Sequence, residues 1–195
     1  MSLRLLVISE DPTYNGYILK PLIERMLGEI GKPNARVTIL TNPKLGGYGQ
    51  AVQAIRNELP DRYGHFHLWL FLPDADRAEN LDALEADLAR KGVSLLCCAA
   101  VPEIEAWLLA GHRDRLKVGW TEVQQNPRLK EEVFGPFLRT YGDPRSAGSG
   151  RETLMRETLA NYCGLLKLCP ELAELERRLR EAFNTKGGSP QSQLP

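Results

Sequence analysis

The sequence has no excess of either charge and no long apolar run, and each of these absences excludes a class of protein. Lysine plus arginine number 25, and aspartate plus glutamate also number 25, so the formal net charge is zero. A protein that coats nucleic acid through its overall charge is therefore excluded, and any nucleic-acid contact must come from a local patch. No apolar run approaches the roughly 20 residues that a membrane-spanning helix needs, so we expect no membrane segment.

Cysteine is also scarce, and its spacing does not favour a redox or zinc site. The four cysteines are Cys97, Cys98, Cys163 and Cys169, and they show no paired short spacing of the kind that holds zinc. Cys97 and Cys98 are neighbours in an apolar segment, so in a strand they would point to opposite faces. We expect buried, unpaired thiols. The N-terminal MSLRLLVIS lacks the features of a signal peptide, and together with reduced thiols this favours the cytoplasm.

The first half of the chain alternates apolar segments with helical ones. Strands are expected at 4–9, 35–41, 67–73 and 93–101. Helices are expected at 16–31, 49–59 and 78–92, where apolar residues recur at helical spacing. We expect Pro21 early in its helix, where a missing N–H is tolerated. Strands that are apolar on both faces and alternate with helices predict a parallel four-stranded sheet flanked by helices, an α/β fold.

After about residue 110 the pattern becomes helical throughout. We expect an α/β domain over 1–110, a helical extension packed on it over 111–184, and a flexible tail over 185–195. The segment 141–150 is rich in glycine, proline and serine and is expected to be a loop. It contains Arg145 and precedes Arg151, and either arginine could meet a phosphate backbone, although a solvated loop is the default.

Acidic side chains follow three of the four expected strands. Glu10 follows the first strand, Asp74 and Asp76 follow the third, and Glu103 and Glu105 follow the fourth. The carboxyl ends of parallel strands meet at one edge of a sheet, so we expect these carboxylates to lie close together. Converging carboxylates without a basic partner suit a hard divalent cation, Mg²⁺ or Mn²⁺.

The same residues have structural interpretations that the sequence leaves open. Asp74 or Asp76 could cap the helix expected at 78–92, and Glu10 could cap the first helix. Glu103 and Glu105 at a helix start would complement the helix dipole. On a regular helix these two lie roughly 200° apart, so both cannot face one metal ion.

A glycine-rich turn before the second helix is a candidate for substrate binding. In KLGGYGQ, backbone amides near Gly46 and Gly47 could approach a phosphate, with Lys44 beside them. Arg77, next to Asp76, is a further candidate for contact with the substrate. Most turns of this composition between a strand and a helix are only turns.

Two short motifs carry a resemblance to a known family. LVISEDPT, followed by LFLPDAD, resembles the Toprim fold of topoisomerases, primases and OLD-type nucleases, in which a glutamate follows the first strand and Asp-x-Asp follows the third. Glu10, Asp74 and Asp76 occupy those places. The resemblance covers about the first 110 residues. VPEIEAWLLAG and the late helices resemble small stand-alone bacterial Toprim-like proteins. Asp11 and Tyr14 depart from the OLD-like pattern, and no glycine follows Asp-x-Asp.

The resemblance implies a Toprim-like, Rossmann-like domain that cleaves nucleic acid with Mg²⁺ or Mn²⁺, in DNA repair or defence. It gives Glu10 a proton-transfer or bridging role, makes Asp74 and Asp76 the metal ligands, and favours Glu105 over Glu103 as a further ligand. The alternative is a catalytically impaired Toprim-derived module that binds nucleic acid or a partner ATPase, and the motif departures favour it. A response-regulator-like receiver would need a lysine after a late strand, and none is there.

Overall fold

A computed structural model describes residues 2–75 and 78–184 of the chain, so Asp76, Arg77 and the tail at 185–195 lie outside the described residues. The four strands form one parallel sheet in the order β2-β1-β3-β4. Their bounds are β1 Arg4–Ile8, β2 Arg36–Ile39, β3 Leu68–Phe71 and β4 Leu95–Cys97. The expected α/β fold, with four parallel strands and a helical C-terminal part, is confirmed, although each strand is shorter than its apolar segment.

The period of two along each strand divides the core into two layers. In β1, Leu5 and Val7 belong to one buried cluster, while Leu6 and Ile8 belong to the other. Cys97 and Cys98 also fall into different clusters, as their adjacency predicts. Burial on both faces explains why the strands read as continuous apolar runs.

The helices of the first half connect the strands. Their bounds are α1 Pro12–Glu29, α2 Tyr48–Asn57, α3 Leu59–Tyr63 and α4 Leu81–Arg90. Helix α1 begins earlier than expected, because Asp11 caps it and Pro12 takes its first position. Pro21 therefore lies in the helix interior and not in its first turn, which corrects the sequence-based expectation. α1 keeps helical geometry through this position, although proline cannot donate a backbone hydrogen bond.

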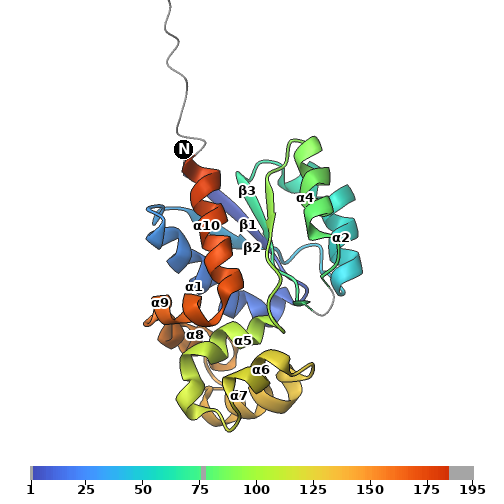
Figure 1. Ribbon diagram of the computed structural model, residues 1–195. Coiled ribbons are helices and arrows are strands. Elements are labelled where there is room, and N and C mark those ends of the chain that lie inside the picture. The colour runs from blue at the N-terminus through green and yellow to red at the C-terminus, as the bar shows by residue number, and fades with distance from the viewer. Residues whose placement is uncertain (1, 76–77, 185–195) are drawn as a thin grey trace, which may run out of the picture.

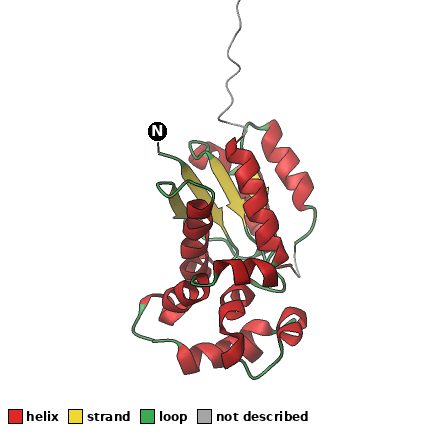
Figure 2. Cartoon of the chain, turned by 60° about the vertical axis from the view of Figure 1, so that its left-hand side comes forward, coloured by secondary structure: helices red, strands yellow, loops and turns green. Residues whose placement is uncertain are grey.

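The second half is helical throughout its described part, as far as Asn184. Its elements are α5 Ile104–Leu109, η2 Ala110–Arg115, α6 Trp120–Gln125, the π-helical η3 Lys130–Phe134, α7 Gly135–Tyr141, η4 Ala147–Gly150, α8 Arg151–Leu159, α9 Tyr162–Leu168 and α10 Pro170–Asn184. Figure 1 shows α5, α6 and α7 grouped below the sheet, beyond the carboxyl ends of the strands. Figure 2 shows the same grouping from another side. Helix α8 packs along α1, and both contribute to one buried cluster.

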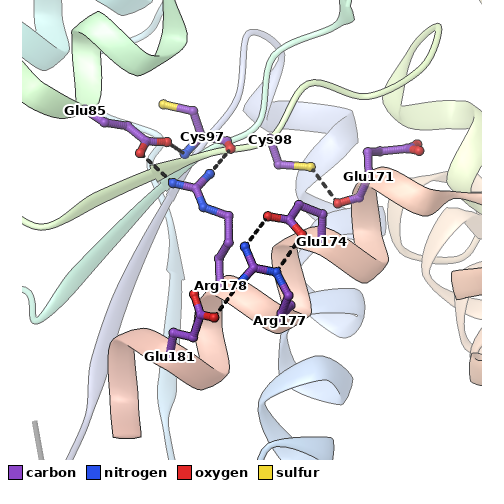
Figure 3. A network of polar contacts seen from close by, with 8 residues as sticks. All are labelled: Glu85, Cys97, Cys98, Glu171, Glu174, Arg177, Arg178 and Glu181. Carbon is purple, nitrogen blue, oxygen red and sulfur yellow. Dashed lines mark hydrogen bonds and ion pairs between the residues drawn. The ribbon is translucent and has the colours of Figure 1, made fainter. Parts of the chain in front are cut away.

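Helix α10 closes the β4 edge of the sheet. Arg178 donates from Nη1 to the carbonyl oxygen of Cys97 at 3.1 Å, and the N–H of Cys97 donates to Glu85 Oε1 at 2.6 Å. Arg178 and Glu85 also pair with each other at 2.5 Å, as Figure 3 shows. Both outward backbone groups of Cys97 are therefore occupied by side chains, which leaves less of this edge free to pair with another strand.

Two further expectations concern unpaired, buried cysteines and the lack of a membrane-spanning segment. All four cysteines are free, as expected, although Cys163 is exposed rather than buried. In the part of the chain that the structure describes, no helix combines the length and the apolar character that crossing a membrane requires.

Candidate functional site

The loops that follow β1 and β3 place Glu10 and Asp74 at the carboxyl edge of the sheet, on neighbouring strands. Asp74 continues the line of β3 by forming an isolated parallel bridge with Ala100. Its Oδ1 accepts a hydrogen bond from the backbone N–H of Ile104 at 3.1 Å, at the start of α5. Asp74 does not cap α4, because α4 begins at Leu81 after Asn80. The capping interpretation is thus wrong for α4, and Asp74 supports α5 instead.

Asp74 is surrounded by other carboxylates. Burial, the charge of Glu105 and the weaker charges of Glu10 and Glu103 together raise its pKa to about 7, against the opposing hydrogen bond from Ile104. These contributions show that Glu10, Glu103 and Glu105 all lie near Asp74. At neutral pH this carboxyl is therefore divided between its protonated and ionised forms.

Glu103 and Glu105 differ in their backbone, because Glu103 precedes α5 whereas Glu105 lies in its first turn. Glu103 has extended backbone, with φ −140° and ψ 161°, and α5 begins only after it. The separation of roughly 200° on a regular helix therefore does not apply, because Glu103 is not on the helix. Glu103 Oε2 accepts a hydrogen bond from the backbone N–H of Lys130 at 3.0 Å. Burial, followed by the charge of Glu105, raises the pKa of Glu103 to about 7.

Glu105 is the most deeply buried of these carboxylates, with 1% of its surface exposed. Its Oε1 lies 3.5 Å from Lys130 Nζ, and the same ammonium lies 3.6 Å from Asp11 Oδ2. No group in the described part of the chain forms a hydrogen bond with Glu105 Oε1. Burial lowers the pKa of Lys130, but Glu105 and Asp11 outweigh it, so the net pKa lies above the ordinary value. Lys130 is thus a charged counter-ion for a buried carboxylate.

Arg151 is a second cation near Glu105 and Asp11, the two partners of Lys130. Arg151 begins α8 and is 8% exposed, so it is not the solvated loop residue that the glycine-rich segment suggested. Its guanidinium carbon lies 4.6 Å from the ring centre of Tyr14 and 5.3 Å from that of Phe134. Burial lowers the pKa of Arg151, whereas Glu105, Tyr14 and Asp11 act to raise it, which places the guanidinium near all three.

The glycine-rich turn is held by a side chain of α2, the helix that follows it. The N–H of Gly46 donates to Gln50 Oε1 at 2.9 Å, so this amide is engaged within the loop. Gly47 precedes α2 with φ 103°, a left-handed conformation that favours glycine. Lys44 is exposed. Asp76 and Arg77 lie outside the described residues, so their predicted roles stay predictions.

Sequence reasoning missed Lys130 and the burial of Arg151. Both come from the helical extension, and neither has a local pattern that sets it apart from a surface cation. Asp11 did have a signal, because an aspartate directly before proline is typical of a helix start.

The donor set is hard and anionic, which suits Mg²⁺ or Mn²⁺ better than softer ions. Glu105 Oε1 is buried and lies 3.5 Å from Lys130 Nζ, so a cation already faces this oxygen, and a divalent ion bound there would compete with the ammonium. Among residues 2–75 and 78–184, however, no three histidine, cysteine or carboxylate side chains are close enough to hold a metal ion. Asp76 is not among those residues.

Comparison of the chain with models of protein families, with curated proteins and with solved structures found no match.

Proposed function

We propose that the chain is a nucleic-acid phosphodiesterase that depends on a divalent cation. The observation that carries the proposal is the meeting of carboxylates from β1, β3 and the start of α5 around Asp74. Carboxylates that share a site raise one another's pKa and so destabilise the folded protein unless a cation offsets them. Such a cluster is more easily explained as a cation site than as a purely structural one.

No three of the described carboxylates are close enough to hold the cation by themselves, so Glu10, Asp74 and Glu105 would contribute to the site only together with Asp76. When bound, Mg²⁺ or Mn²⁺ would neutralise phosphate oxygens and lower the pKa of a bound water. Without a metal ion the pKa of Asp74 is about 7, so this carboxyl would release its proton when the cation binds. Glu10, in the loop after the neighbouring strand β1, is the candidate for proton transfer.

A second function is favoured by one specific observation. Lys130 places an ammonium 3.5 Å from Glu105 and 3.6 Å from Asp11, so the chain supplies a cation of its own. A module that binds nucleic acid or a partner ATPase without cleaving would need no metal in this cluster. In that case Lys130 would serve as a permanent counter-ion.

Cleavage of supercoiled plasmid and of single-stranded DNA with Mg²⁺ and with Mn²⁺ tests the proposal. We expect Glu10→Gln and Asp74→Asn each to abolish cleavage, while binding of nucleic acid survives better, because the chemistry depends on the transition state. Glu58→Gln is the matched control, since Glu58 follows α2 and pairs with Arg62 at the surface.

Two outcomes contradict the proposal. Cleavage at the full rate in both variants would assign the activity to another site or to a contaminant. No cleavage by the wild type in either metal, with binding of nucleic acid or of an ATPase retained, would favour the regulatory module.

A further inference from the structure

The pair formed by Tyr14 and Arg151 has features that packing alone does not require. Tyr14 lies in the first turn of α1, yet 46% of its surface is exposed. The guanidinium of Arg151 lies 4.6 Å from the ring centre and covers one face of the ring. Almost half of this residue therefore stays accessible to a ligand although the guanidinium packs on its ring.

Arg151 has hydrogen-bonding capacity that the described part of the protein does not use. Its Nη1 donates to the carbonyl oxygen of Gly148 at 2.9 Å, but its buried Nε has no hydrogen-bond partner among the described residues. Within the same residues, the guanidinium forms no ion pair with a carboxylate. An arginine with no carboxylate at ion-pair distance keeps a positive charge and a planar set of donors that are well suited to bind a phosphate.

The backbone fixes this pair beside the carboxylate cluster. The N–H of Tyr14 donates to Asp11 Oδ1 at 3.4 Å, and Asp11 Oδ2 lies 3.6 Å from Lys130 Nζ. Gly150, with φ 90°, allows the sharp turn that starts α8 at Arg151. An ideal Cβ at Gly150 would lie 2.6 Å from the backbone nitrogen of Asp143, so glycine alone fits this turn.

We infer that Tyr14 and Arg151 form the substrate-binding element of the site, and that the substrate is a single-stranded nucleic acid. Arg151 contacts a backbone phosphate and the Tyr14 ring stacks on an adjacent base. This inference rests on the proposed function in that both require nucleic acid at the carboxylate cluster. An unpaired strand is the expected substrate, because a free base can stack on an aromatic side chain while a paired base is stacked within its duplex.

The test measures binding and needs no cleavage. Fluorescence anisotropy with a labelled single-stranded oligodeoxynucleotide and with the matching duplex gives both affinities, at low salt and with Ca²⁺ in place of Mg²⁺. We expect the wild type to bind the single strand more tightly than the duplex. Tyr14→Ala should weaken single-strand binding about ten-fold, as loss of one stacked base does, and Tyr14→Phe should stay within about two-fold of the wild type.

Matched controls separate recognition from folding. Tyr141→Ala removes another exposed tyrosine that lies against an arginine, Arg115, and it should bind as the wild type does. Arg151→Gln should weaken binding at least as much as Tyr14→Ala and reduce the salt dependence by about one phosphate contact. Arg151→Lys retains the charge and should keep part of the binding. It replaces Arg151→Gln in the test if Arg151→Gln proves unstable. Arg145→Gln, at a side chain that is 92% exposed, is the control for the loop.

The outcomes distinguish this inference from the proposed function. Weakened binding by Tyr14→Ala and Arg151→Gln, with intact Tyr14→Phe, supports the inference even if the wild type cleaves nothing. Equal binding of single strand by wild type and Tyr14→Ala overturns it, even if metal-dependent cleavage is found. A stronger affinity for the duplex, or no binding of either oligonucleotide, also overturns it.

Discussion

Lys130 Nζ lies 3.5 Å from Glu105 Oε1, and this ion pair links the helical extension to the carboxyl edge of the sheet. Glu105 is almost fully buried, whereas the Lys130 side chain is 41% exposed. The lysine can therefore move away into solvent, while the glutamate cannot. Because of this asymmetry, a divalent cation could replace the Lys130 ammonium beside Glu105.

Replacing Lys130 with methionine should destabilise the metal-free protein by about 1–3 kcal/mol, because the buried Glu105 loses its charged partner. Mn²⁺ should then raise the melting temperature of the variant more than that of the wild type, since the ion no longer competes with the ammonium. Thermal unfolding with and without Mn²⁺ measures both effects. Lys117→Met, at an exposed lysine, is the control. An equal response to Mn²⁺ in Lys130→Met and the wild type would show that Lys130 does not occupy the cation site.

The stability of the metal-free protein should fall as pH rises from about 4 to about 7. Asp74 and Glu103 have folded-state pKa values of about 7, above their ordinary values of 3.8 and 4.5. In that range the folded state holds protons that the unfolded chain has lost, so raising the pH favours unfolding.

Asp74→Asn should flatten this pH dependence. Allowing for solvent screening of a half-buried group, the change between about pH 5 and about pH 7.5 should be about 1 kcal/mol, or about 2–4 °C in melting temperature. Asp143→Asn, in an exposed loop, should leave the wild-type slope unchanged. A slope that Asp74→Asn does not alter would contradict the assignment of this titration to Asp74.

The closure of the β4 edge by Arg178 can be tested against its neighbour on the same helix. Arg178→Met removes the partner of Glu85 and the hydrogen bond to Cys97, and should cost about 2–3 kcal/mol of the free energy of unfolding. Arg177→Met removes only exposed pairs with Glu174 and Glu181, so it should cost much less than Arg178→Met does. Denaturant unfolding measures both, and hydrogen exchange at the Cys97 amide should accelerate only in Arg178→Met. An equal loss of unfolding free energy in the two variants would show that the contacts of Arg178 at the β4 edge add no stability beyond that of an exposed ion pair.

Gly148→Ala should disturb the loop that carries Arg151. An added Cβ would lie 2.5 Å from the ring of Tyr17, and φ at Gly148 is +61°. Gly31→Ala is the matched control, because φ there is +76° and nothing lies within 4 Å of the added Cβ. We expect Gly31→Ala to cost about 1 kcal/mol from backbone strain alone and Gly148→Ala to cost about 1–3 kcal/mol more. Equal melting temperatures for the two variants would contradict close packing of Tyr17 on this loop.

The sequence by itself determined the sheet and the position of its carboxylates along the chain. Apolar segments of strand length, alternating with helical periods, identified all four strands, because burial on both faces leaves a continuous run that no polar residue interrupts. The placement of Glu10 and Asp74 at one edge followed from the parallel order of the strands, which brings their carboxyl ends together. These features depend on the local sequence pattern and on connection rules that leave few possible topologies for alternating strands and helices.

Only the tertiary structure decided which cations meet those carboxylates. Lys130 and Arg151 lie far from Glu105 along the chain. Lys130 comes within 3.5 Å of Glu105, and Arg151 lies near enough for the charge of Glu105 to act on its pKa, because the helical extension packs beyond the strand ends. Asp74 supports α5 rather than α4, because the hydrogen bond that it accepts comes from Ile104, beyond the next strand. Local propensity has no information about contacts between segments this distant, which are set by how the helices pack once the core is formed.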